Sequence, residues 1–206
     1  MRYSVIKRMS FRVGIVATAT LLLHPILLTS QKTSGLPVNR DAAIGAEFEE
    51  RVADYMKIHE KAQAGLVAPK STESPVQISE FQHQLAARIR VLRPNAKQGD
   101  IFTPAITGVF HRLVAIAMHG SDGARIRTSF ERAEPIEGVH LDVNQAYPDG
   151  MPLQSMPPSL LLNLPKLPKE LEYRFVGREL ILRDIAANLI VDVIPEVTTV
   201  PRQKKK

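Results

Sequence analysis

The stretch of sequence that decides the fold is Leu171–Ile194, which reads LEYRFVGRELILRDIAANLIVDVI. It begins with two runs, Leu171–Val176 and Glu179–Asp184, that are separated only by Gly177 and Arg178. A two-residue connection with glycine first is typical of a β-hairpin, because glycine readily adopts the positive φ that this turn needs. The sequence therefore predicts an antiparallel hairpin.

Both faces of this hairpin predict the same register. The two-residue turn places Tyr173 opposite Leu182 on one face and Glu172 opposite Arg183 on the other. Apolar pairs and pairs of opposite charge both stabilise neighbouring strands. A slip by one residue would exchange the two faces, so we expect this register to be strongly preferred.

A third strand is expected directly after the hairpin. Asn188 is a turn residue, and the apolar run Leu189–Ile194 that follows it is ended by Pro195. The three strands would form a small antiparallel meander.

The residues before this region read as helices. Apolar side chains recur every three or four residues in Asp41–Ala64, in Pro75–Arg93 and from Pro104 to Gly120. Ser74 and Thr103 each stand directly before a proline, which is the arrangement of an N-cap followed by the first helical residue. A short fourth helix, capped by Ser121 or Asp122, is expected to extend to about residue 133.

The segment between the helices and the meander has a different composition. Val139–Val143 alternates as a strand does, and Pro148–Pro168 contains six prolines. Proline restricts its predecessor to extended conformations, so we expect extended chain with one helical turn after Pro158. The candidates for partner binding in and beside this segment are Leu160, Leu162, Leu164, Leu167 and Tyr147. The alternative is that the leucines cover the core of their own domain.

These elements predict an α+β fold, in which three to four N-terminal helices pack on a small C-terminal antiparallel β-meander. Residues 36–134 would form the helical part, and residues 135–201 the proline-rich segment and the meander of the same domain. Residues 1–35 would be a signal peptide or membrane anchor, and residues 202–206 a basic tail.

The leader has the pattern of a secretory signal peptide. Met1–Arg12 carries four cations and no acidic residue, and the sixteen residues of Val13–Leu28 are largely apolar. As a helix this run would measure about 24 Å, short of the roughly 30 Å hydrocarbon core of a membrane. Export to the periplasm or the exterior with cleavage near Gly35 is favoured over a retained anchor, and both are favoured over a buried helix.

The net charge of +6 does not indicate a nucleic-acid binder. Nine of the 27 basic residues lie in residues 1–35 and 202–206, which hold no acidic residue, so the rest has 18 basic against 21 acidic residues. Binding to nucleic acid requires cations clustered on the folded surface. Contact with a membrane is expected only through an uncleaved N-terminal segment.

The sequence lacks the residues that several kinds of chemistry require. The chain has no cysteine, which excludes disulfides, thiolate metal ligands and a cysteine nucleophile. Glu80 and His83 form one Glu-x-x-His pair, but a di-iron site of this type needs two such pairs on helices. The other pair, Glu137 and His140, follows Pro135, where no helix is expected. We therefore expect no metal site and no cofactor, and no catalytic residue is identified.

A resemblance supports export. The runs RPNAKQGDIFTP (Arg93–Pro104) and MPPSLLLNLPKLPKELEYRFVGRELILRDIAANLIVDVIP (Met156–Pro195) resemble a group of uncharacterised exported proteins of environmental bacteria. The resemblance implies a location outside the cytoplasm and implies nothing about chemistry.

We therefore expect an exported cell-envelope protein that is a non-catalytic binding or structural module, with another protein or an envelope component as its partner. The alternative is a metal-independent hydrolase that uses carboxylates of the C-terminal half. Its candidates lie on or beside expected strands, namely Asp142, Asp149, Asp184 and Asp192. The separation of two carboxylates decides such chemistry, and a sequence does not supply it.

Overall fold

A computed structural model describes residues 39–70, 74–131, 141–148 and 158–198 of the chain. Within these residues the fold is α+β, as expected, with helices first and an antiparallel sheet at the C-terminal end. The elements are α1 Arg40–Gln63, α2 Pro75–Leu92, α3 Pro104–His119, α4 Gly123–Glu131, α5 Pro158–Leu161, β1 Leu171–Val176, β2 Glu179–Asp184 and β3 Leu189–Ile194.

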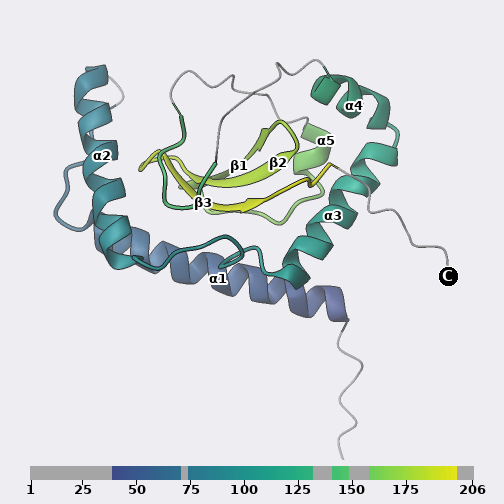
Figure 1. The fold of residues 1–206 in the computed structure, drawn as a ribbon, viewed down its shortest axis with the longest axis horizontal. Helices are drawn as coiled ribbons and strands as arrows, with labels where there is room; N and C mark the ends of the chain where they lie inside the picture. The colour runs from purple at the N-terminus through teal and green to yellow at the C-terminus, as the bar shows by residue number, and fades with distance from the viewer. Residues whose placement is uncertain (1–38, 71–73, 132–140, 149–157, 199–206) are drawn as a thin grey trace, which may run out of the picture. The chain divides into compact units, whose positions relative to one another are not determined.

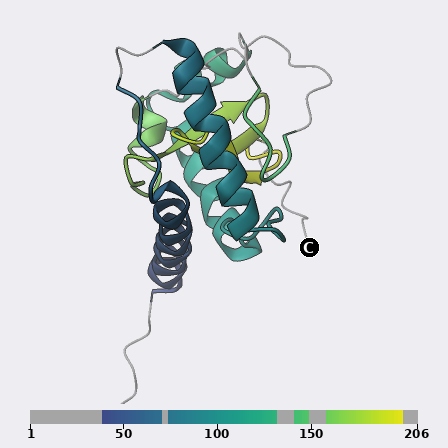
Figure 2. The same cartoon turned by 90° about the vertical axis from the view of Figure 1, so that its left-hand side faces the viewer.

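The helices surround the sheet on several sides. Figure 1 shows α1 running along the sheet, with α2 beyond one end of the strands and α3 beyond the other. Turned by 90°, α2 crosses in front of the strands (Figure 2). The expected leader, residues 1–35, lies outside the described residues.

The helix starts confirm the predicted caps. The side chain of Ser74 accepts a hydrogen bond from the backbone of Gln77, and the side chain of Gln77 accepts one from the backbone of Ser74, which is a complete capping box. At the start of α3 the Thr103 hydroxyl accepts from the N–H of Ile106. Helix α1 begins at Arg40, one residue before the predicted start.

The sheet has the order β1-β2-β3 and the predicted register. Tyr173 faces Leu182, and Glu172 faces Arg183, whose guanidinium donates to the Glu172 carboxylate over 2.7 Å. Gly177 has a φ of 58°, which confirms the reason for a glycine at the first turn position.

The expected strand Val139–Val143 is not found in its described part, residues 141–143. The chain turns at Asn144 instead, whose φ of 65° is incompatible with a strand. The Asn144 side chain donates to the carbonyl of Arg93 at the end of α2 over 2.9 Å, and this contact favours the turn. Within residues 141–148, Ala146 forms an isolated bridge with Leu189 of β3.

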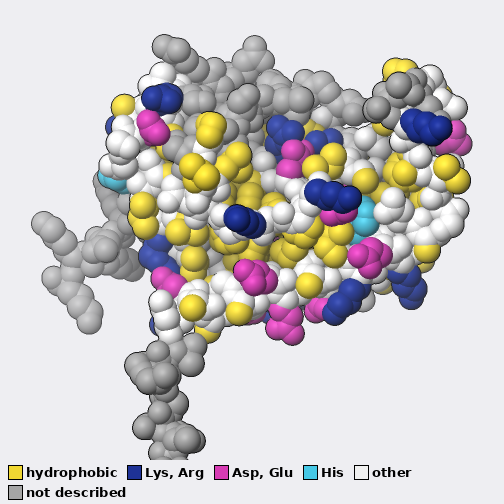
Figure 3. Space-filling model, turned by 180° about the vertical axis from the view of Figure 1, so that it is seen from behind, with side chains coloured by type: hydrophobic (Ala, Val, Ile, Leu, Met, Phe, Trp, Pro, Cys, Tyr) yellow, Lys and Arg dark blue, Asp and Glu magenta, His cyan; other side chains and the backbone are white. Residues whose placement is uncertain are grey.

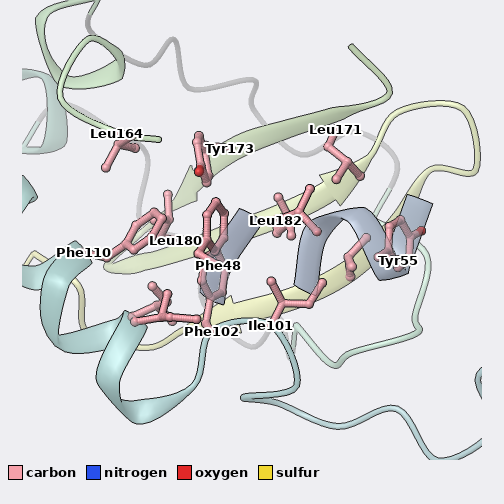
Figure 4. Close-up of a cluster of buried hydrophobic side chains, with 14 of the residues drawn as sticks. Phe48, Tyr55, Ile101, Phe102, Phe110, Leu164, Leu171, Tyr173, Leu180 and Leu182 are labelled. Carbon is pink, nitrogen blue, oxygen red and sulfur yellow. The ribbon is translucent and has the colours of Figure 1, made fainter. Parts of the chain in front are cut away.

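The main core lies between the sheet, α1 and α3 (Figure 4). Four aromatic rings pack there: Phe110 lies 5.3 Å from Phe48, 5.1 Å from Phe102 and 5.7 Å from Tyr173, measured between ring centroids. The edge-to-face arrangement of these three pairs is a favourable one for aromatic side chains. The core therefore joins both halves of the sequence in one domain.

A smaller apolar cluster lies on the opposite face of the sheet. Its buried members are Tyr147, Val176, Ile181, Ile190 and Val193. Because the sheet is buried on both faces here, its outer strands, rather than its faces, offer backbone groups to a partner.

Candidate functional site

A groove of about 430 Å³ lies beside β1, which is an edge strand of the sheet. One wall consists of Leu161 and residues 164–167, and the other consists of residues 171–174 of β1. We call this the β1 groove. Figure 3 shows one face of the molecule, on which hydrophobic side chains gather with Lys and Arg side chains among them.

The proline-rich segment forms its wall through local contacts. After the helical turn of α5, which confirms the prediction at Pro158, the carbonyl of Pro165 accepts a hydrogen bond from the Tyr173 hydroxyl over 3.1 Å. The carbonyl of Pro168 accepts from the N–H of Leu171 over 3.0 Å. These bonds hold the segment against the beginning of β1.

The charged residues of the groove are unevenly paired. The Glu172 carboxylate lies 2.7 Å from Arg183 and 2.7 Å from Arg174, so one acid serves two guanidinium groups. Among the residues that the structure describes, none forms a hydrogen bond with the buried Nε of Arg174. Lys166 is exposed on the opposite wall. The charged side chains that line the groove, Lys166, Glu172 and Arg174, together have a net positive charge.

The five residues expected to bind a partner are placed differently from one another. Leu160, Leu164 and Tyr147 are buried, and Leu167 packs against the core. Leu162 is 86% exposed. The burial of Leu160 and Leu164 favours the alternative that these leucines cover their own domain. Leu164 and Leu167 nevertheless line the β1 groove.

Three polar side chains form a buried polar cluster where β2 meets α1. The Asp184 carboxylate, 0% exposed, accepts from the Tyr55 hydroxyl over 2.7 Å and from Nδ1 of His59 over 2.6 Å. Its second oxygen accepts from the N–H of Ala187 over 2.9 Å. His59 is 1% exposed, so the cluster holds elements together and is closed to a substrate.

The buried polar cluster changes the ionisation of its members. The hydrogen bond to Asp184 is the largest cause that raises the pKa of His59, and burial opposes it. Burial, followed by the charge of Asp184, raises the pKa of Tyr55 well above its usual range. His59 therefore favours the protonated form, which makes an ion pair with Asp184 inside the domain.

The second buried carboxylate, Asp192 in β3, has a different set of partners. It is 0% exposed, and its partners in the described ranges are all backbone N–H groups, those of Gly99, Ile101, Phe102 and Val193. Asp192 thereby fixes the loop between α2 and α3 against the sheet.

The other residues considered for metal binding or catalysis do not lie together. Glu80 and His83 lie on an exposed face of α2, and Asp142 is exposed. Asp149, Glu137 and His140 lie outside the described residues. In the part of the chain that the structure describes, no three His, Asp or Glu side chains are grouped so that they could hold a metal ion.

The sequence analysis did not identify residues that lie far apart in the chain but contact each other in the fold. His59 and Asp184 are 125 positions apart, and nothing local connects them. One sign was available: His59 lies one turn after Tyr55, on the apolar stripe of its helix. For Arg174 the sequence offered no comparable sign.

No helix among the described residues is both long and apolar enough to cross a membrane. No protein-family model, no curated protein and no solved structure matches this chain.

Proposed function

We propose that this chain is an exported cell-envelope protein whose mature part is a non-catalytic module that binds a partner at the β1 groove. The observation that carries this proposal is the groove itself. It combines an edge strand, apolar leucine side chains and surplus positive charge.

Export is supported by the sequence of the leader. A cluster of cations followed by an apolar run without charge is the pattern that the secretory machinery recognises. The resemblance to exported proteins implies the same location.

The absence of catalysis is supported by how the two buried carboxylates are used. Asp184 is bonded to Tyr55, His59 and Ala187, and Asp192 is bonded to backbone N–H groups. Both are fully buried. A general acid or base must reach its substrate within hydrogen-bond distance. Neither carboxylate favours the hydrolase alternative.

Fractionation of cells and sequencing of the mature N-terminus test the export. We expect an extracytoplasmic protein that begins near Leu36. An intact Met1 on a protein in the cytosol would contradict the location.

Site-specific photo-crosslinking in the producing cells tests the binding surface. A crosslinking amino acid at Leu162, beside the β1 groove, should give a discrete adduct with one partner. The same amino acid at Val67, an equally exposed aliphatic position (90% against 86%), is the matched control and should give none. Equal labelling from both positions, or no adduct from Leu162, would count against binding at this groove.

A further inference from the structure

Helix α2 presents one side to the core and the opposite side to solvent. Its buried residues are Leu85, Ala86 and Ile89, and Figure 2 shows the helix on the outside of the molecule. The exposed side contains five positions that recur every three or four residues, so they lie in one row along the helix. We call this row the α2 face, and its members are Val76, Glu80, His83, Ala87 and Val91.

The two ends of the α2 face are apolar. Val76, near the beginning of the helix, is 74% exposed, and Val91, near its end, is 78% exposed. Val76 borders a hollow of about 600 Å³, and Val91 borders another of about 340 Å³, into which Ala62 of α1 also faces. Two exposed valines on one helix face, each beside a hollow, form the kind of seam that a second helix covers.

The charges at the two ends of the α2 face are opposite. The hollow at the beginning of α2 is lined by Glu80, and the hollow at its end by Lys61 and Arg88. Within the described ranges, the Glu80 carboxylate has one long hydrogen bond, of 3.3 Å, from Gln84 of the same helix. Arg88 binds the end of α1 through Nη1. The face is therefore acidic at one end and basic at the other.

We infer that the α2 face binds the α2 face of a second copy of this chain, with the two helices antiparallel about a two-fold axis between residues 83 and 84. In this arrangement Val76 lies opposite Val91 of the second copy. Glu80 lies opposite Ala87, where it reaches Arg88 of the second copy. Because the axis is two-fold, each of these contacts occurs twice.

The order of the charges favours a second copy over an unrelated helix, and an antiparallel pair over a parallel one. A parallel pair would place Glu80 beside Glu80, and like charges in contact oppose association. An unrelated partner would need the reverse order of charges between two apolar positions, which this chain already supplies. The α2 face lies outside the β1 groove, so the dimer goes beyond the proposed function.

The dimer should be weak and reversible. Helix α2 has 18 residues and is about 27 Å long, so contact along one helix buries less than the roughly 1,600 Å² of a standard interface. We expect association in the micromolar range, measured by sedimentation equilibrium of the chain as purified from the cells that make it.

Single-cysteine variants test the antiparallel arrangement, because the chain has no cysteine of its own. When Val76→Cys and Val91→Cys are mixed and oxidised, the mixed disulfide should exceed either same-variant disulfide at least about tenfold. The two copies of residue 76 would lie about 22 Å apart, which is beyond the reach of a disulfide. Ile116→Cys, at a 61% exposed position of α3, is the matched control and should give only a statistical mixture with either variant.

A charge reversal tests the polar contacts. Glu80→Lys should weaken the dimer about tenfold, because a like charge then replaces an opposite one at both symmetric contacts. Glu49→Lys makes the same change at an exposed position of α1 and should leave the association unchanged.

Four results would each overturn the inference: a monomer at all concentrations, a statistical mixture of disulfides, an excess of same-variant disulfides, or an equal effect of both lysine variants. Partner binding at the β1 groove is tested separately by the crosslink from Leu162, so neither proposal depends on the other.

Discussion

The outward-facing backbone groups of the two outer strands, β1 and β3, differ in their hydrogen-bond partners. Along β3, the N–H of Ile190 donates to the carbonyl of Gln145, and the carbonyl of Val191 accepts from Arg93. Along β1, the backbone of Tyr173 faces a groove instead. Exposed strand edges invite pairing with other chains, and proteins usually cover them. The difference concerns Tyr173: among the described residues its outward backbone groups have no hydrogen bond, whereas Ile190 and Val191 of β3 are bonded.

The two buried carboxylates, Asp192 and Asp184, also have different kinds of partner. Asp192, in β3, accepts from backbone N–H groups, which do not titrate. Asp184 lies opposite Leu171, the first residue of β1, and accepts from His59, which does titrate. One partner of Asp184 thus changes its charge with pH, and because Asp184 pairs with Leu171 of β1 and with Leu189 of β3, this contact serves both outer strands.

The largest expected effect comes from Asp192→Asn. The amide would turn a donor toward several backbone N–H groups and leave them unsatisfied inside the domain, so we expect unfolding free energy to fall by about 3 kcal/mol. Urea denaturation measures this. Asp54→Asn, which removes an exposed pair with Lys57, is the control and should cost about 0.5 kcal/mol or less. Similar losses in both variants would refute the role of Asp192.

Asn144→Ala should have the next largest effect. Alanine loses the side-chain bond to Arg93 and is strained at the φ of 65°, for a combined loss of about 2 kcal/mol. Asn144→Gly keeps the backbone conformation accessible and should cost about 1 kcal/mol less. Equal stability of the two variants would show that the turn does not have this conformation.

The change of unfolding free energy with pH should be smaller than the effects of these two substitutions, because neutral His59 still donates a hydrogen bond to Asp184. The raised pKa of His59 contributes stability that is fully present below its unfolded value of about 6.5. That contribution is lost as the pH rises through the folded pKa. Urea midpoints measured at increasing pH should fall over this range in the native protein and not in His59→Gln. The same fall in both would place the titrating group elsewhere.

Tyr173→Phe should have the smallest effect. It removes the hydrogen bond to the Pro165 carbonyl and keeps the ring in the core, so we expect a loss of about 1 kcal/mol. Urea denaturation measures this loss. An unchanged unfolding free energy would show that the hydroxyl does not hold the Pro165 carbonyl against β1.

The sequence predicted the elements that are specified locally. Gly177 and the pairing of Glu172 with Arg183 lie within twelve residues, and Ser74 and Thr103 cap helices that follow directly. Such features depend on backbone geometry and on immediate neighbours, which a single sequence contains.

The remainder depends on contacts between distant parts of the chain. The alternation at Val139–Val143 suggested a strand, but Asn144 binds the end of α2 and the chain turns. The candidate site was predicted only in part: Leu164 and Leu167 do line the groove, whereas Lys166 and Arg174 become significant only once the proline-rich segment lies beside β1.

Hydrogen exchange of two backbone amides tests the central claim most directly. In the purified protein, we expect the amide of Tyr173 to exchange at least about a hundredfold faster than that of Ile190, which is bonded to Gln145. Equal protection of the two amides would mean that β1 is covered as completely as β3, and would contradict the account.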